Sequence, residues 1–450
     1  MKPEPNIFSS LFLFTTPTWY HNLKAVASVF SDFEKLPGEI QEQLNLKVDY
    51  SNSQLTKADA AFQLIKRGWV DVNPSNQFQP ENCSISAKDF YTFARRFNKR
   101  HWIWYSLFRR LLSLRNPINE IHAFITTRKI QTLDFYSSPL NQPTTIDLEK
   151  VELDKLTGVS VIIPTLNRYS YLKDVLEDLE KQTYPNFEVI VVDQSEPFNS
   201  GFYNQFNLQI KLIRQNEMKL WKARNTAIHE SKYDLLLFFD DDSRVSTDWI
   251  FQHLKVLHFF NADISAGISL KEGQTIPEHY SYFRFSDQFD SGNSLVKKSV
   301  FDLAGLFDEQ FEKMRMGDGE FGLRAALNGL QSISNPLASR VHLKVGKGGL
   351  REMGSWDAFR SHKWFAPKPV PSVVYFFRRY FPIQNVREAI ILGVVLSLAP
   401  YKHKSSKVLT ISSVILSLLF FPVIGIQVYK SWSIAKQMLL EGPKIKKHQN

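Results

Sequence analysis

Three consecutive carboxylates, those of Asp240, Asp241 and Asp242, directly follow the apolar run Leu-Leu-Leu-Phe-Phe at 235–239. Adjacent anions repel one another, and each is costly to hold beside a low-dielectric core. The end of a strand needs only one polar residue to enter a turn, so three acids indicate that a positive group is bound there. Carboxylate oxygens are the ligands that Mg²⁺ and Mn²⁺ take in proteins. An acidic turn that closes a strand is the alternative interpretation of this aspartate cluster.

The residues before the aspartate cluster have the pattern of an open α/β sheet. Nearly continuous apolar runs at 159–164 and 187–193 are typical of strands buried on both faces. Between them, apolar residues recur with helical spacing within 171–182, which completes a strand–helix–strand unit. Ligands of such sheets bind beyond the carboxyl ends of the strands, where Asp193 and the aspartate cluster fall. A third strand, a second helix and a fourth strand are predicted at 208–215, 221–231 and 233–240.

The composition is that of a globular protein with anionic partners. The 450 residues suffice for two or three domains, and 43% of them are hydrophobic and 22% charged. A net charge of +10 favours nucleotides, phospholipid surfaces or nucleic acid as partners. Cys83 is the only cysteine, which excludes a disulfide framework and fits a reducing compartment. The N-terminus lacks the pattern of a signal peptide, so none is expected.

Changes in composition divide the chain into three parts. Residues 1–155 are predicted to be an N-terminal domain of unknown role that ends in a linker, 156–345 the sheet domain, and 346–450 a helical region. Within the first part, 93–110 interleaves Arg and Lys with aromatic residues. Three interpretations stay open for it: a core-packing helix with a basic face, a membrane-surface helix, or a nucleic-acid patch.

Five motifs resemble, in order, those of family 2 glycosyltransferases, which are inverting enzymes with the GT-A fold. The motifs cover roughly 158–345 and read VSVIIPTLNR, KQTYPNFEVIVVDQS, KARNTAI, LLLFFDDD and GDGEFGLRAALNG. The resemblance implies a GT-A fold, that is, an open mixed sheet flanked by helices, here with an N-terminal extension and a C-terminal hydrophobic helical tail. It also implies a nucleotide-diphosphate sugar as donor.

On the donor side, the resemblance implies a Mn²⁺ or Mg²⁺ ion bound by the aspartate cluster. Asp242 is expected to be the direct ligand, with Asp240 and His342 also at the metal, while Asp240 and Asp241 contact ribose, metal-bound water or donor sugar. Glycines after His342 predict a loop that closes over the donor. The resemblance also implies that the nucleoside pocket is lined by Pro164, Thr165 and Asn167. The base is assigned to Asp193 and Gln194, and the donor phosphates to Arg224.

On the acceptor side, Asp318 matches the family's general base, which deprotonates the attacking hydroxyl. Gly317 stands where relatives commonly have a glutamate, and Glu320 matches the later acid of the motif. Asn293 is expected near the acceptor sugar. A helix N-cap is the alternative role for Asp318, and the two roles can coexist.

The C-terminal part predicts membrane association. Positions 408–429 carry no charge over 22 residues, which is long enough to span a bilayer. Pro422 and Gly425 interrupt this segment, and lysines flank it on both sides. These features favour a tail that lies in or dips into the cytoplasmic face of the membrane. A single span and a buried helical pair are the alternatives.

Together these features predict a membrane-associated, metal-dependent inverting glycosyltransferase. It would transfer a sugar from a UDP-, GDP- or dTDP-linked donor to a hydroxyl of a glycan or lipid-linked acceptor, in the synthesis of a cell-surface polysaccharide. No nucleic acid is expected as a macromolecular partner. A catalytically inactive scaffold that binds nucleotide, glycan or lipid is the alternative, suggested by Gly317 and Gln194. A nucleotidyltransferase is disfavoured because no glycine-rich phosphate loop follows the first strand.

Overall fold

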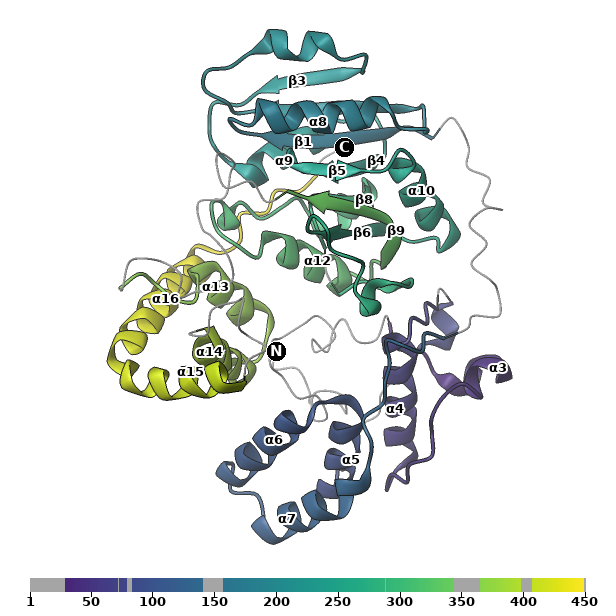
Figure 1. The fold of residues 1–450 in the computed structure, drawn as a ribbon, viewed down its shortest axis with the longest axis vertical. Coiled ribbons are helices and arrows are strands. Elements are labelled where there is room, and N and C mark those ends of the chain that lie inside the picture. The colour runs from purple at the N-terminus through teal and green to yellow at the C-terminus, as the bar shows by residue number, and fades with distance from the viewer. Residues whose placement is uncertain are drawn as a thin grey trace. The chain divides into compact units, whose positions relative to one another are not determined.

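The computed structural model describes residues 29–71, 73–78, 83–140, 157–287, 289–343, 365–397 and 407–448. They form two compact units (Figure 1). The helical unit contains the described residues from 29 to 140 together with 277–285, and the sheet unit contains those of 157–276 and 286–448. Both boundaries predicted from the sequence, near 155 and 345, lie outside the described residues. The C-terminal helices, which the sequence analysis separated, group with the sheet.

Side chains cap two of the helices in the helical unit. Asn52 caps α4 (Ser53–Lys66), and Ser86 forms a capping box with Asp89 at the start of α5 (Ala87–Phe97). A buried ion pair joins these two helices, since Arg96 Nε lies 2.6 Å from Asp59 Oδ2. The other elements are α3 (Gly38–Gln41), α6 (Arg100–Leu112), α7 (Pro117–Thr126), β7 (Arg284–Phe285) and short 3-10 turns at Phe33–Lys35, Pro74–Asn76, Thr127–Lys129 and Glu278–Tyr280.

The sheet unit is organised around one mixed sheet. Its strands are β1 (Val159–Thr165), β2 (Phe187–Asp193), β3 (Ile210–Arg214), β4 (Leu235–Phe239), β5 (Ser243–Val245), β6 (Ile264–Leu270), β8 (Asn293–Lys297) and β9 (Ser332–His342). They lie in the order β3-β2-β1-β4-β8-β6-β9-β5. The first four are parallel to one another, whereas β8 pairs antiparallel with both β4 and β6. Every residue of β1 is buried, as its continuous apolar sequence predicts.

Helices cover both faces of this sheet, because successive strand residues point to opposite sides. On one face, alternate residues of β1 and β2 pack with α8 (Tyr169–Glu180) and α10 (Trp249–Phe259). On the other, Phe238 of β4 contacts Phe301 of α11 (Ser299–Ala304), which stacks on Phe321 of α12 (Gly317–Leu327). Helix α9 (Leu220–Glu230) packs against β1 and β2. The predicted fold class, an open mixed α/β sheet flanked by helices, is confirmed.

Asn293, at the start of β8, lies wholly inside this fold. Its Oδ1 accepts hydrogen bonds from Trp249 Nε1 at 2.8 Å and from His253 Nε2 at 3.2 Å. Its Nδ2 donates to the carbonyls of Ile268 and Ala338, at 3.1 and 2.9 Å. The sequence analysis expected Asn293 beside the acceptor, but the structure uses both ends of its amide to join β8, α10, β6 and β9.

The C-terminal helices pack together and return to the sheet. They are α13 (Pro371–Tyr380), α14 (Ile383–Ser397), α15 (Lys407–Leu419) and α16 (Phe421–Glu441), and α16 packs on α13. After α16 the chain runs back toward the sheet (Figure 1), where Lys444 N donates to Asp308 Oδ1 at 2.9 Å. Among the described residues, no one helix meets the length and hydropathy needed to cross a bilayer. The pair 411–419 and 421–441, bent by 85°, meets them together.

The buried His253 generates a prediction about acid stability. Burial lowers its pKa to about 4, although Asn293 and Ser265 oppose the shift. A histidine in an unfolded chain has a pKa near 6.5. Between pH 6.5 and 4, therefore, the unfolded chain binds a proton at this residue and the folded chain does not. We expect full stability above pH 6.5 and a loss of about 3 kcal/mol as the pH falls to 4.

The measurement is the free energy of unfolding of the sheet unit against pH, in urea, for the wild type and for His253→Gln. Glutamine keeps hydrogen-bonding groups but does not titrate, so the variant should lose this part of the pH dependence. Equal slopes for the two proteins between pH 6.5 and 4 would show that His253 does not cause it.

Candidate active site at the carboxyl edge of the sheet

Two buried arginines hold Asp240, which follows β4. Arg224 Nη2 lies 2.8 Å from Asp240 Oδ1, and Arg340 Nη1 lies 2.7 Å from Asp240 Oδ2. Arg224 has no exposed surface; it also donates to the carbonyl of Ser291 and lies over the ring of Trp221. The sequence analysis expected Arg224 to point at donor phosphates. The structure instead places it behind Asp240, where it fixes that carboxylate.

Asp241 and Asp242 share a third arginine, Arg168. Its Nη1 lies 3.0 Å from Asp241 Oδ1 and 3.1 Å from Asp242 Oδ2, while Thr165 Oγ1 donates to Asp241 Oδ2 at 2.8 Å. Burial raises the pKa of Asp241 to about 6, and Arg168 opposes this while Asp242 adds to it. Arg168 was not singled out in the sequence, although it ends the motif VSVIIPTLNR directly after β1.

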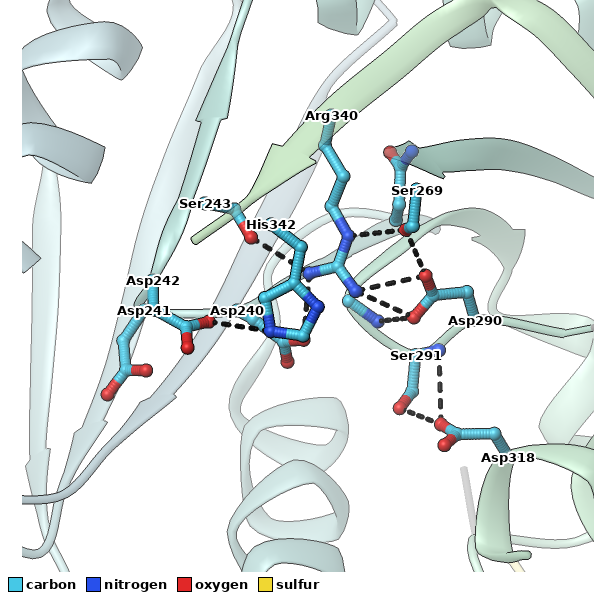
Figure 2. A network of polar contacts seen from close by, with 12 residues as sticks. Asp240, Asp241, Asp242, Ser243, Ser269, Asp290, Ser291, Asp318, Arg340 and His342 are labelled. Carbon is cyan, nitrogen blue, oxygen red and sulfur yellow. Dashed lines mark hydrogen bonds and ion pairs between the residues drawn. The ribbon is translucent and has the colours of Figure 1, made fainter. Parts of the chain in front are cut away.

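The three residues predicted to bind metal lie together. Asp240, Asp242 and His342 each offer one ligand atom, and these atoms lie within 4.8 Å of one another. The register of β5 with β9 brings these residues together, because Ser243 pairs with His342. As a result, His342 Nε2 lies 3.2 Å from Asp242 Oδ1 (Figure 2). Two carboxylates and an imidazole fit a divalent cation, and the imidazole favours Mn²⁺ over Mg²⁺.

The residues predicted to bind the nucleoside gather at the ends of β1 and β2. Asp193 is wholly buried, and its carboxylate accepts hydrogen bonds from the hydroxyls of Tyr169 and Tyr203, at 2.7 and 2.9 Å. Burial and the nearby Asp193 raise the pKa of both tyrosines. Asp193 therefore fixes the positions of these two tyrosines at the ends of the strands.

Gln194 and Asn167 are also among these predicted residues, and Pro164 lies buried within β1. Gln194 Oε1 accepts from the backbone N–H of Lys219 at 2.7 Å, and its buried Nε2 has no hydrogen-bond partner among the described residues. Asn167 adopts a left-handed backbone conformation, with φ 54°, and its Oδ1 accepts from the N–H of Glu196 at 2.8 Å. Asn167 therefore ties the loop after β1 to the loop after β2.

The predicted base, Asp318, lies in the first turn of α12. Its Oδ1 accepts hydrogen bonds from the N–H of Ser291, at 3.2 Å, and from the Ser291 hydroxyl. No side chain caps this helix, whose N-cap is Met316. Asp318 thus does not have the N-cap role that the sequence analysis kept as an alternative.

Asp240, Asp242 and His342, the candidate metal ligands, are called the metal corner below. Arg340 connects this metal corner with the predicted base Asp318, a link that the sequence analysis missed. Besides Asp240, Arg340 binds both carboxylate oxygens of Asp290, at 3.0 and 2.9 Å. The next residue in the chain, Ser291, donates a hydrogen bond to Asp318 (Figure 2). Burial raises the pKa of Asp290, but Arg340 together with the hydrogen bonds from Ser269 and the Gly292 N–H holds this pKa below its usual range. Arg340 and His342 are two residues apart in β9 and therefore point to the same side of the strand. This spacing was the signal in the sequence that could have placed Arg340 at the site.

Glu320 lies wholly buried between α12 and α13. Its two oxygens bind Arg324 Nε and Nη2 at 2.9 and 2.8 Å, and Oε1 also accepts from the Tyr380 hydroxyl at 2.5 Å. The sequence analysis placed Glu320 on the acceptor side as a second candidate base. The structure gives it no exposed surface for an acceptor and uses it to join the two helices.

Gly317 has a steric explanation. A Cβ atom at this position would lie 2.1 Å from Cζ2 of Trp221, which is too close for any side chain. Trp221 is itself fixed, since its Nε1 donates to the carbonyl of Phe311 at 3.1 Å. The indole therefore fills the space that a side chain at position 317 would need.

The sheet has an acidic cluster at its carboxyl edge and a carboxylate at the head of a later helix, an arrangement that fits the expected class of nucleotide-sugar transferase domains. Residues 160–309 match the family model described as Glycosyl transferase family 2. The chain thus carries a domain of glycosyltransferase family 2.

Two curated relatives and one solved structure illustrate this similarity. Glycosyltransferase GlyA of Streptococcus pneumoniae is 28% identical over 200 residues, 44% of this chain and 27% of GlyA. Glycosyltransferase AglE of Haloferax volcanii is 30% identical over 166 residues, 34% of this chain and 53% of AglE. This chain thus covers about a quarter to a half of their length. The mannosyltransferase PcManGT of Pyrobaculum calidifontis, solved with GDP-Man and Mn²⁺, is 16% identical with a TM-score of 0.41, covering 64% and 88% of the two chains.

The contact between Gly317 and Trp221 predicts the effect of adding one methyl group. Gly317→Ala drives Cβ into the indole, and we expect it to lower the free energy of unfolding by about 1–3 kcal/mol. Gly319→Ala is the matched control, because its Cβ would meet only the flexible end of Met316, at 3.2 Å. The midpoints of thermal and urea unfolding measure the difference, and equal midpoints for the two variants would contradict the steric explanation.

Proposed function

We propose that this protein is an inverting glycosyltransferase that moves a sugar from a nucleotide-diphosphate donor to a hydroxyl of a glycan or lipid-linked acceptor. The observation that carries the proposal is the path from Asp240, which lies beside Asp242 and His342, through Arg340 to Asp290, whose neighbour Ser291 binds Asp318 (Figure 2). It joins a candidate metal corner, suited to a leaving diphosphate, to a carboxylate suited to activate a hydroxyl. In-line inversion needs these two functions on opposite sides of the anomeric carbon.

On the donor side, Asp242, His342 and Asp240 would hold Mn²⁺ or Mg²⁺, which as a Lewis acid neutralises charge on the departing diphosphate. Arg168 is the arginine best suited to meet phosphate oxygens, because its side chain is 14% exposed whereas that of Arg224 is fully buried. The partnerless Nε2 of Gln194 supports contact with a carbonyl of a pyrimidine base.

On the acceptor side, Asp318 would take the proton of the attacking hydroxyl. Its carboxylate is partly exposed, whereas Glu320 is buried and ion-paired. The hydrogen bonds from Ser291 orient the Asp318 carboxylate through Oδ1. Proton transfer requires hydrogen-bond reach between this carboxylate and the attacking hydroxyl.

Attachment to the cytoplasmic face of a membrane fits the C-terminal helices. Helix α15 and the start of α16 expose a run of large apolar side chains: Val408, Leu409, Ile411, Val414, Ile415, Leu416, Leu418, Leu419, Phe420 and Phe421. The 85° bend between the two helices suits a segment that lies in the interface or dips into it. Such a position supports a lipid-linked acceptor in the synthesis of a cell-surface polysaccharide.

Replacement of the base tests the reaction. We expect Asp318→Asn to lower kcat by about 10² to 10⁴ while the affinity for donor stays constant, because the base contacts acceptor and not nucleotide. Nucleotide released from a panel of UDP-, GDP- and dTDP-sugars gives kcat, and calorimetry gives donor affinity. Glu320→Gln should instead lower the unfolding temperature and reduce turnover less. Full turnover by the Asp318→Asn variant would show that Asp318 is not the general base.

Replacement of the metal ligand tests the donor site separately. Asp242→Asn should remove Mn²⁺ binding, measured by electron paramagnetic resonance, and with it metal-dependent binding of nucleotide, while the circular dichroism spectrum stays unchanged. EDTA should have the same effect on the wild type. If neither the variant nor EDTA changes nucleotide binding or turnover, the metal assignment is wrong. A scaffold without activity would bind nucleotide but release none from any donor.

A further inference from the structure

Helices α6 and α7 of the helical unit form an antiparallel pair, called the α6–α7 hairpin below, whose inner side is fixed by polar contacts. Arg110 of α6 binds both oxygens of Glu120 in α7, at 2.7 and 2.8 Å, and the hydroxyl of Tyr91 in α5 donates to the same carboxylate at 3.0 Å. Glu120 is buried, and so are Ile103 and Ala123 beside it. The orientation of each helix about its own axis is therefore determined.

The outer side of the hairpin is apolar. In α6, Trp104, Phe108 and Leu112 are 63%, 62% and 67% exposed, at the i, i+4, i+8 positions that share one helix face. In α7, Ile118, Ile121 and Ile125 are exposed at i, i+3 and i+7. An ion pair inside and large apolar side chains outside reverse the usual arrangement of a helix pair in water, and clustered exposure of this kind marks an interaction surface.

Positive charge surrounds this apolar face. Residues 99–129 contain seven Lys and Arg against one acid, Glu120, a net charge of +6. Glu120 is buried against Arg110, so the charges left at the surface are all positive. The six exposed basic residues are Lys99, Arg100, Arg109, Arg115, Arg128 and Lys129.

We propose that the α6–α7 hairpin docks on an anionic membrane surface, with its apolar face in the boundary between headgroups and acyl chains and its basic residues at the lipid phosphates. Aliphatic side chains such as Leu112, Ile118 and Ile125 offer nothing to stacked bases, which argues against nucleic acid. Trp and Phe with Leu and Ile, bordered by Lys and Arg, are the composition of interfacial helices. The proposal depends neither on the transfer reaction nor on the C-terminal helices.

A second docking element has a physical consequence for attachment. One interfacial contact gives weak, reversible binding, whereas two contacts in one chain make the second event intramolecular. The hairpin therefore converts transient contact into stable attachment if α15 and α16 also bind lipid.

The first experiment is flotation of the full-length protein with vesicles of phosphatidylcholine alone and with 30% phosphatidylglycerol. We expect the triple variant Trp104→Ser/Phe108→Ser/Leu112→Ser to bind the anionic vesicles at least tenfold more weakly than the wild type. Leu303→Ser, which removes a 64% exposed leucine of the sheet unit, is the matched control and should bind as the wild type does. The variant Arg100→Gln/Arg115→Gln/Arg128→Gln should lose the preference for anionic lipid.

A local probe separates the hairpin from the C-terminal helices. In a Cys83→Ser background, Phe108→Cys carries an environment-sensitive nitrobenzoxadiazole label, and Leu303→Cys carries the control label. Anionic vesicles should shift the emission of the label at 108 to the blue and leave that at 303 unchanged. Vesicle binding without a shift at 108 would overturn the proposal, and so would a shift produced by single-stranded RNA or by added unlabelled protein but not by vesicles.

Discussion

The guanidinium of Arg340 is the interaction on which the site depends. It is fully buried and binds Asp240 on one side and Asp290 on the other, with Ser243 and Ser269 taking its remaining donors. Two partly buried carboxylates held this way would be disfavoured without the cation between them, because like charges repel. A planar, bidentate donor set also fixes where both carboxylates point, which a lysine would not do. Arg340 thus sets the spacing between metal corner and base.

The same reasoning explains why the chain tolerates three adjacent aspartates. Arg224 and Arg340 hold Asp240, and Arg168 holds Asp241 and Asp242. Arg340 also binds Asp290, so three arginines face four carboxylates and leave one negative charge. A divalent cation would make this group of charges net positive. That charge suits a diphosphate, whose own negative charge the protein alone does not balance.

The sequence predicts the sheet well because β1, β2 and β4 are continuous apolar runs and α8 has a regular helical period. It also places Asp240, Asp242 and His342 at one site. The sequence does not predict that Arg340 or Asp290 belongs to the candidate active site. Their pairing depends on the register of β9, about 100 residues after β4. The partners that Asn293 and Arg224 have within the protein were not predicted for a related reason: a polar residue in an apolar context is satisfied either by a ligand or by the protein, and only the fold shows which.

The joint between α12 and α13 gives the C-terminal helices a connection to the chemistry. Glu320 lies two residues after Asp318 and binds Tyr380, while Arg379 binds both Asp308 and Glu320. Lys444 returns after α16 to bind the same Asp308. Helix α13, on which α16 packs, is therefore tied directly to the helix that carries the proposed base, and the segment after α16 is tied to Asp308. Because buried charged contacts of this kind resist rearrangement, any surface that orients α13 and α16 also orients Asp318.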